Sequence, residues 1–348
     1  MKNNVLIIGN FSFGKDSFNG QTAKTRDYYF YIRERYGKDE VVPLDTAQWR
    51  KKPVSSYIRL FRLCAKSKNA VLLLGANAAQ YIVPVVCLLK KIFKISLFWS
   101  VVGGSLIYDK KAQKRLLKHF NSMDAIYFET NIMADYFKDM GYKNILYAPV
   151  FSKRSLTEEF NPTENDGIMK FCTYSRVCKE KGISEAINAV KLINKDSVKC
   201  TLDIFGKPYP EYEEEFNAIT EGTEGFIFKR DYLSGDNVID VLSQFDAMLF
   251  PTYYSGEGFP IGVVECYLGG VPVIASNWHY NGEIIKNGDT GFIFESEDKD
   301  GLVNCIEALL ADRQLALKMR KNAYKYSEQF KPDAVLSDLY KRIDGIGE

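Results

Sequence analysis

Residues 250–276 read F-P-T-Y-Y-S-G-E-G-F-P-I-G-V-V-E-C-Y-L-G-G-V-P-V-I-A-S, and residues 281–294 read N-G-E-I-I-K-N-G-D-T-G-F-I-F. The apolar run at residues 247–250 is typical of a buried strand. After a polar loop with two glycines, we expect a short helix over residues 260–268, because proline at its start presets φ. A second buried strand is expected at residues 271–275. This order predicts an anion site, since the first N–H groups of a helix have no internal partner.

Two carboxylates frame that site, Glu257 in the loop and Glu265 within the expected helix. Carboxylates repel phosphate, so these two indicate hydrogen bonds to hydroxyl groups. The ligand would therefore carry both sugar hydroxyls and phosphates. Gly256, Gly258 and Gly262 leave room for close approach of the backbone. The alternative is a solvated loop followed by a helix with an exposed glutamate.

The segment Glu257–Glu265, E-G-F-P-I-G-V-V-E, resembles the E-x7-E signature of the retaining, group 1 nucleotide-sugar glycosyltransferases. The downstream segments G-G-V-P-V-I-A-S and N-G-D-T-G-F-I-F resemble the same family. The resemblance implies the GT-B architecture, an α/β fold in which two Rossmann-like α/β/α domains with parallel sheets face each other across a cleft. It covers residues 171–294 well, whereas the first half of the chain matches mainly in strand order and loop placement.

The charge of the chain is divided unevenly between its halves. The 348 residues are enough for two α/β domains with separate cores. Residues 1–150 contain 24 Lys and Arg against 11 Asp and Glu, whereas residues 151–348 contain 22 against 33. The asymmetry indicates that the first half faces an anionic partner, which we interpret as a membrane and not as nucleic acid. Seven scattered cysteines without a C-x-x-C pair, and a start without a signal-peptide pattern, favour a cytoplasmic location.

We expect the first domain to cover residues 1–150, with strands and helices alternating. Gly20 lies in the loop after the first strand, where the family usually has a glycine-rich loop next to the ligand. A connecting loop without a ligand is the alternative. Gly103 and Gly104 follow a later strand, near a position where many relatives have a histidine that touches the donor sugar. This departure leaves the donor sugar and the acceptor geometry open.

A helix is expected over residues 54–68, with an apolar face packed on the sheet and basic residues largely elsewhere. The apolar face would contain Tyr57, Ile58, Phe61, Cys64 and Ala65. Between Thr46 and Tyr108 the chain has ten basic residues and no acidic one. We therefore predict that residues 50–68 rest on an anionic membrane surface through their basic side. An ordinary helix with a basic outer face is the alternative.

The apolar stretch Ala70–Leu89 raises the question of a transmembrane helix. Polar residues, a glycine and a proline interrupt it, and it separates into a strand-like and a helix-like part. Both features argue against a membrane span.

Residues 151–166 lack periodicity and are interpreted as the linker, so the second domain would cover residues 167–329. A terminal helix at about 330–348 would pack back on the first domain, as the family pattern implies. The segment S-R-V-C-K-E-K-G at 175–182 resembles the family's G-R-x-x-x-x-K-G, with serine in place of the first glycine. Arg176 and Lys181 would then hold a diphosphate, and the alternative is a pair of surface salt bridges.

The resemblance also implies the roles of the site residues. Glu265 would bind the ribose hydroxyls of the nucleotide, and Glu257 would contact the donor sugar near the reacting centre. Arg176 and Lys181 would stabilise the departing diphosphate. Further donor contacts would come from the loop after the first strand, from the strand ends near the base and from the loop before the helix. These residues are Gly20, Gly206, Arg230, Gly258, Phe259, Pro260 and Ile261.

We therefore predict a retaining glycosyltransferase that moves a hexose or N-acetylhexosamine from a UDP-sugar to a saccharide acceptor. A lipid-linked acceptor in cell-surface polysaccharide or glycan synthesis fits the basic first half. The enzyme would be cytoplasmic and peripheral on the inner face of the membrane. No metal and no cofactor are expected, because the two cations neutralise the diphosphate and the nucleotide sugar is a substrate. The alternatives are a non-hydrolysing sugar-nucleotide epimerase and a catalytically inactive GT-B binding module.

Overall fold

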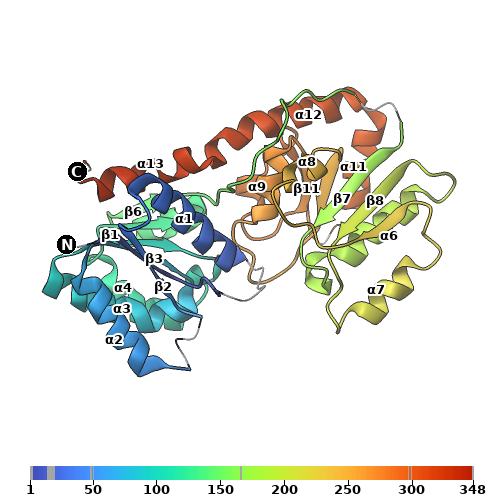
Figure 1. Ribbon diagram of the computed structural model, residues 1–348. Helices are drawn as coiled ribbons and strands as arrows, with labels where there is room; N and C mark the ends of the chain where they lie inside the picture. The colour runs from blue at the N-terminus through green and yellow to red at the C-terminus, as the bar shows by residue number, and fades with distance from the viewer. Residues whose placement is uncertain are drawn as a thin grey trace. The chain divides into compact units, whose positions relative to one another are not determined.

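The computed structural model describes residues 3–13, 20–47, 49, 51–164, 167–296, 298 and 300–346. The chain divides into two compact units, Met1–Phe151 with Pro332–Glu348 and Ser152–Lys331. Each unit is built on a six-stranded parallel sheet with helices on both sides (Figure 1). The predicted α/β class with two Rossmann-like units is therefore confirmed.

The first sheet has the strand order β2-β1-β3-β4-β5-β6. Its strands are β1 (Asn3–Gly9), β2 (Val41–Asp45), β3 (Ser67–Leu74), β4 (Ser96–Val101), β5 (Ala125–Phe128) and β6 (Ile145–Tyr147). Its helices are α1 (Gly20–Tyr36), α2 (Pro53–Ala65), α3 (Ala76–Phe93), α4 (Lys110–Phe120), α5 (Asn131–Asp139) and α13 (Pro332–Ile343), with a 3-10 turn η1 at Ser105–Ile107. Nearly continuous apolar runs form the central strands because both faces of a parallel sheet are covered.

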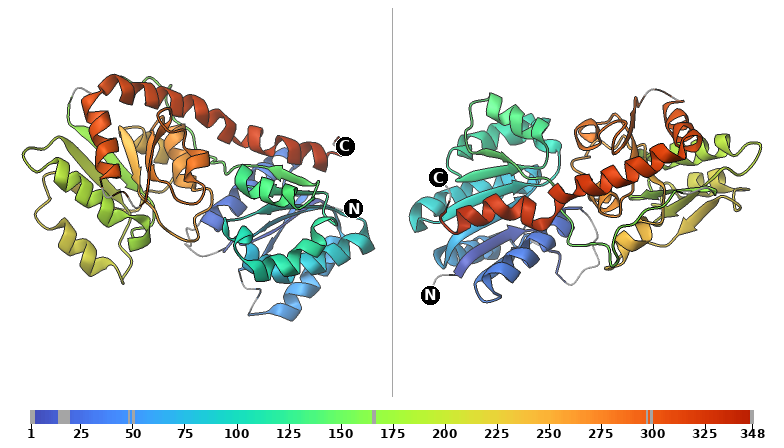
Figure 2. Two further views of the ribbon diagram at one scale, coloured as in Figure 1. Left: turned by 180° about the vertical axis from the view of Figure 1, so that it is seen from behind. Right: turned by 90° about the horizontal axis from the view of Figure 1, so that it is seen from above.

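The final helix α13 belongs to the first unit, on the same face of the sheet as α1 (Figure 2). The Tyr127 hydroxyl on β5 donates to Asp338 at 2.8 Å, and the Tyr36 hydroxyl on α1 donates to Asp344 at 2.8 Å. Burial and the Asp344 contact raise the pKa of Tyr36 to about 12, so this phenol remains a donor at neutral pH. The terminal segment is thus tied to the sheet by both packing and hydrogen bonds.

The second sheet has the order β12-β11-β10-β7-β8-β9. Its strands are β7 (Met169–Tyr174), β8 (Cys200–Phe205), β9 (Ile227–Arg230), β10 (Ala247–Phe250), β11 (Val273–Ser276) and β12 (Gly291–Phe294). Its helices are α6 (Ile183–Ile193), α7 (Glu213–Thr220), α8 (Val238–Leu242), α9 (Ile261–Leu268), α10 (Asn281–Ile284), α11 (Gly301–Ala311) and α12 (Arg313–Tyr326), with 3-10 turns η2 (Lys179–Lys181) and η3 (Ser327–Phe330). The predicted helix after the polar loop is α9, although Pro260 is its N-cap residue and not its first turn.

The prediction for α2 was wrong in its length and in its packed face. The helix ends at Ala65, and Ser67 and Lys68 already belong to β3. Leu60 and Cys64 are its buried residues, whereas Ile58 and Phe61 are about half exposed. The helix is therefore rotated about its axis relative to the expectation, and apolar side chains face outward.

Helix α3 is long and apolar enough to cross a membrane by length and composition alone. In the fold it packs against β3, β4, α2 and α4, and it follows β3 after a single glycine. Its buried residues are Ala76, Ala79, Ile82, Val83, Val86, Cys87 and Leu89. The predicted separation into a strand and a helix is what the structure shows.

The expected linker does not form a free connection. The chain divides between Phe151 and Ser152, and residues 152–164 belong to the second unit. Ser152 is buried there. Asn165 and Asp166, the last residues of the expected linker, lie outside the described part of the chain.

Candidate active site

The carboxyl ends of β7, β10 and β11 meet at one edge of the second sheet, because these strands are parallel neighbours. The loops that leave this edge contain most of the predicted site residues. Ligands of open α/β sheets bind outside this edge. A groove of about 380 Å³ in the second unit is lined instead by residues such as Lys170 and Asp246, next to the starts of β7 and β10. It therefore lies away from the site.

Glu265 on α9 is completely buried, and three donors surround its carboxylate. Ser152 Oγ and Arg154 Nη1 donate to Oε1, and the Tyr174 hydroxyl donates to Oε2 at 2.9 Å. Burial and the adjacent carboxylate raise the pKa of Tyr174, so its hydroxyl stays protonated. A buried carboxylate needs such partners, because its desolvation is otherwise costly.

Gly262 allows α9 to approach the end of β7. A Cβ atom at this position would lie 2.9 Å from the carbonyl oxygen of Tyr174. Any other residue would push the helix away from the strand. The glycine therefore brings the Glu265 carboxylate within reach of the Tyr174 hydroxyl.

Glu257 is buried in the loop between β10 and α9, and its partner is Lys181. Lys181 Nζ and Thr252 Oγ1 both donate to Oε2 of Glu257, the latter at 3.1 Å. Both side chains are more than nine-tenths buried. The predicted sugar-binding acid and the predicted diphosphate-binding lysine thus neutralise each other, which rules out the alternative of an exposed salt bridge for Lys181.

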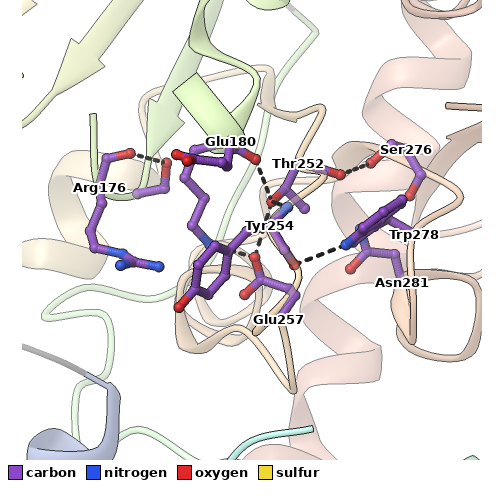
Figure 3. Close-up of polar contacts among 10 residues, drawn as sticks. Arg176, Glu180, Thr252, Tyr254, Glu257, Ser276, Trp278 and Asn281 are labelled. Atoms are coloured by element: carbon purple, nitrogen blue, oxygen red, sulfur yellow. Dashed lines mark hydrogen bonds and ion pairs between the residues drawn. The ribbon is translucent and has the colours of Figure 1, made fainter. Parts of the chain in front are cut away.

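Tyr254 holds both predicted cations. The Arg176 guanidinium carbon lies 4.5 Å from the centre of the Tyr254 ring, and Lys181 Nζ lies 5.2 Å from it. The indole N–H of Trp278 donates to the Tyr254 carbonyl oxygen at 2.9 Å and fixes the loop from the β11 side (Figure 3). Ser276 Oγ, at the end of β11, donates to the Thr252 carbonyl oxygen at 2.5 Å and holds the same loop. We did not predict Tyr254, because nothing in the sequence places its ring under two cations.

The start of α9 offers backbone donors. Among the described residues, the N–H groups of Gly258, Phe259, Ile261 and Gly262 have no hydrogen-bond partner within the protein. Pro260 has no N–H, so it contributes only its fixed backbone angle. The Phe259 ring packs against Phe330, 5.5 Å between centroids, so this residue can serve a ligand only through its backbone. These N–H donors follow Glu257, the partner of Lys181, within five residues of the chain.

The remaining predicted donor-binding residues lie at three different places. Gly206 follows β8 with φ +124° and a virtual Cβ 3.2 Å from Val177, so it belongs to the same edge. Arg230 at the end of β9 is bonded to Asp203, and its side chain is half exposed. Gly20 is the exposed first residue of α1 in the first unit. The loop residues 14–19 before it, including Asn19, lie outside the described residues.

The first unit has a buried ion pair at the carboxyl edge of its own sheet. Lys24 Nζ donates to Glu129 Oε1 at 2.8 Å and to the Val101 carbonyl oxygen at 2.9 Å. Glu129 Oε2 accepts the N–H of Gly103 at 3.2 Å. Both charged side chains are at most 4% exposed. The pair anchors the glycine turn after β4. The only sequence signal for it was an acid directly after the β5 strand.

Ser152 and Arg154 are further residues that we did not predict. Both lie in the segment interpreted as linker, and both donate to Glu265. Arg154 Nε also donates to the Gly235 carbonyl oxygen at 2.8 Å, so it ties the β9–α8 loop to the carboxylate. A serine and an arginine in an aperiodic segment gave no signal for this role.

Residues 156–326 match the sequence model of the family described as "Glycosyl transferases group 1". The match includes the E-x7-E segment and lies in the second unit of the two-unit fold, so the family model and the sequence motif point to the same family. The predicted resemblance is thus confirmed.

Two relatives of the chain carry glycosyltransferase names. Poly(glycerol-phosphate) alpha-glucosyltransferase of Bacillus subtilis is 23% identical over 69% of this chain and 37% of its own length. The capsular polysaccharide biosynthesis glycosyltransferase CapM of Staphylococcus aureus is 28% identical over 50% of this chain and 44% of its own length. The chain thus spans well under two thirds of these two proteins.

Solved structures share the fold over the whole chain. HepE of Anabaena in complex with UDP has a TM-score of 0.72 at 14% identity, covering 99% of this chain and 100% of that chain. The same protein has also been solved with UDP-glucose. This likeness confirms the predicted GT-B architecture.

The glycine that follows Lys181 gives a prediction about stability, because Gly182 fixes the backbone that positions the lysine. It has φ +71°, and a Cβ would lie 2.0 Å from the Pro251 carbonyl oxygen. We expect Gly182→Ala to lower the free energy of unfolding by about 1–3 kcal/mol more than Gly222→Ala. Gly222 is the matched control because it has the same φ and no neighbour within 4 Å of a Cβ. Chemical denaturation measures both, and equal losses would show that the contact with Pro251 is unimportant.

The buried ion pair Lys24–Glu129 of the first unit gives a second prediction about stability. Lys24→Met should lower the free energy of unfolding by about 3–5 kcal/mol, because Glu129 is left buried without its cation. The double variant Lys24→Met/Glu129→Leu should recover most of that loss in urea denaturation. The exposed pair Lys138–Asp135 is the control, and Lys138→Met should cost less than about 1 kcal/mol. A double variant as unstable as the single one would contradict the role of the unpaired charge.

Proposed function

We propose that the chain is a retaining glycosyltransferase that transfers a hexose or N-acetylhexosamine from a UDP-sugar to a saccharide acceptor. The observation that carries the proposal is the arrangement around β7, where Arg176 and Lys181 lie against Tyr254, Lys181 pairs with Glu257, and Glu265 lies beside Tyr174. Family membership and the UDP and UDP-glucose complexes of HepE support the choice of a UDP-sugar.

In this proposal the nucleotide is held by Glu265 and its surroundings. The ribose hydroxyls donate to the carboxylate, which now accepts hydrogen bonds from Ser152, Arg154 and Tyr174. Because the carboxylate is completely buried, a ribose hydroxyl would reach it by displacing Arg154, whose side chain is partly exposed. The base lies toward the ends of β8 and β9, near Gly206 and Arg230.

The diphosphate is held by cations and backbone donors. Arg176 and Lys181 supply positive charge on Tyr254, and the N–H groups of Gly258, Phe259 and Ile261 supply hydrogen bonds. The charge on the leaving oxygens grows in the transition state, where these groups stabilise it without a metal. Among the described residues no cluster of three His, Cys, Asp or Glu could hold a metal ion.

Glu257 contacts the donor sugar near the reacting carbon. Its Oε2 is already occupied by Lys181 and Thr252, so Oε1 is the oxygen that accepts a sugar hydroxyl. The acceptor hydroxyl attacks from the face that the diphosphate leaves, and the leaving phosphate oxygen takes its proton. Such same-face transfer retains the configuration of the anomeric carbon and needs no side-chain base.

The acceptor in this proposal is a lipid-linked saccharide of cell-surface polysaccharide synthesis, reached from the cytoplasmic side of the membrane. The name of the relative CapM and the basic first unit support this choice. Residues 51–68 and the neighbouring basic residues would rest on anionic lipids, whereas Arg50 lies outside the described residues.

A donor-binding screen tests the proposal. We expect UDP and one UDP-sugar to raise the melting temperature, and GDP-sugars not to, since a ligand of the folded state stabilises it. Glu265→Gln should weaken UDP binding by about 1–3 kcal/mol in calorimetry, because the hydroxyls lose an ionised acceptor. Asp246→Asn, a buried carboxylate at the start of β10, is the matched control and should leave UDP affinity unchanged.

Turnover separates the proposal from its competitors. Transfer to a saccharide with retained configuration, followed by NMR of the product, is the expected result. Conversion of the UDP-sugar to its epimer without an acceptor would instead indicate an epimerase. Binding of UDP without any turnover would indicate an inactive module.

The Tyr254 ring gives a prediction for the diphosphate site. Tyr254→Leu should weaken UDP binding by about 1–2 kcal/mol, because Arg176 and Lys181 lose the aromatic face that positions them. Tyr254→Phe keeps that face and should bind UDP nearly as the wild type does. Calorimetry with UDP and with uridine separates the effects, since uridine lacks the diphosphate and should lose little affinity in either variant. A phenylalanine variant as weak as the leucine variant would contradict the role of the ring.

A further inference from the structure

We propose that α2 and α3 of the first unit form a surface that inserts apolar side chains into the head-group region of an anionic lipid bilayer. The α2–α3 surface consists of Val54, Ile58 and Phe61 on α2 and of Tyr81, Leu88 and Ile92 on α3. The inference deepens the membrane association in the proposed function, on which it rests, and replaces purely electrostatic contact with insertion.

The apolar residues of α2 lie on one face of the helix. Val54, Ile58 and Phe61 are spaced by four and three positions, which places them on one side of an α-helix. They are 72%, 48% and 50% exposed. The buried residues Leu60 and Cys64 lie about 100° further around the helix, so α2 is apolar toward the core and also toward solvent.

Helix α3 repeats this arrangement. Tyr81, Leu88 and Ile92 are spaced by seven and four positions and are 55–58% exposed. The two helices lie side by side in the first unit (Figure 1). The Phe61 and Phe93 rings meet at 5.1 Å between centroids, and the Tyr57 hydroxyl donates to the Tyr81 carbonyl oxygen at 3.2 Å. The two apolar stripes therefore form one rigid surface.

Positive charge surrounds this surface. No acidic residue occurs between Thr46 and Tyr108. Exposed basic residues lie on both helices and at their ends. They are Lys51, Lys52, Arg59, Arg62, Lys66, Lys91 and Lys94. Apolar side chains ringed by cations fit an anionic bilayer, in which acyl chains receive the former and lipid phosphates the latter.

The charge also decides against a second copy of the chain. An interface between two identical α2–α3 surfaces would bring their cations together without any acidic partner from the same region. The bilayer contact is also peripheral, because the other side of α3 is part of the core on β3 and β4 and cannot face lipid.

Fluorescence quenching tests insertion directly. Leu88→Trp and Leu192→Trp introduce the probe on α3 and on α6 of the second unit, at leucines that are 58% and 55% exposed. Vesicles contain phosphatidylcholine with phosphatidylglycerol, and their acyl chains are brominated. We expect bromine to quench the probe at position 88 and to leave position 192 unchanged relative to wild type. Equal quenching at the two positions, or none at position 88, overturns the proposal.

Charge variants test the choice of lipid. The double variant Arg59→Gln/Arg62→Gln should lower the binding constant for anionic vesicles, measured by flotation, about 25-fold, since each cation contributes about fivefold. Lys195→Gln/Lys318→Gln removes the same charge from exposed sites in the second unit and should change flotation little. Equal effects of both pairs overturn the proposal, as would concentration-dependent dimers that Leu88→Gln, but not Leu192→Gln, disrupts.

Vesicle binding is measured without donor or acceptor, so its outcome is independent of turnover. Loss of binding with intact transfer to a soluble saccharide would defeat the membrane surface alone. Absence of transfer with intact, charge-dependent insertion would defeat the proposed reaction alone. Thermal unfolding of each variant shows that the fold is preserved, which is expected because all substituted side chains are exposed.

Discussion

The second unit depends on the need to compensate two buried carboxylates at one sheet edge. Glu265 is stabilised by three donors and Glu257 by a buried lysine and a threonine. Removing a carboxylate from water is costly unless such partners are in place. Gly262 and Gly182 serve this compensation, since each permits a backbone approach that a Cβ would block. The site geometry therefore follows from charge compensation as much as from sheet topology.

The parts of this arrangement that the sequence predicts are local. Residues 247–276 carry a strand, loop, helix and strand whose apolar runs and punctuating glycines are contiguous in the chain, and all four elements form. Arg176 and Lys181 could be placed at the end of β7 for the same reason. The family resemblance then supplied the roles that spacing alone could not.

The contacts that escaped prediction join residues far apart in the chain. Arg154 and Glu265 are 111 positions apart, and Lys24 and Glu129 are 105 positions apart. Neither pair leaves a local pattern, because only the completed sheets bring their elements together. The prediction of the buried face of α2 was wrong for a related reason. Both of its sides are apolar, so periodicity could not decide which one the sheet would cover.

The pairing of Lys181 with Glu257 has a consequence for how a diphosphate can be received. With the lysine neutralised inside the protein, an arriving dianion finds Arg176 as the exposed cation of the cluster, together with the N–H groups at the start of α9. Tyr254 touches both cations, so its ring joins the exposed Arg176 to the buried Lys181. In the proposed reaction, a movement of Lys181 toward the leaving oxygens would take the counter-charge from Glu257 and leave this carboxylate a stronger acceptor for a sugar hydroxyl. The proposed diphosphate-binding and sugar-binding groups are thus joined by the buried Lys181–Glu257 ion pair.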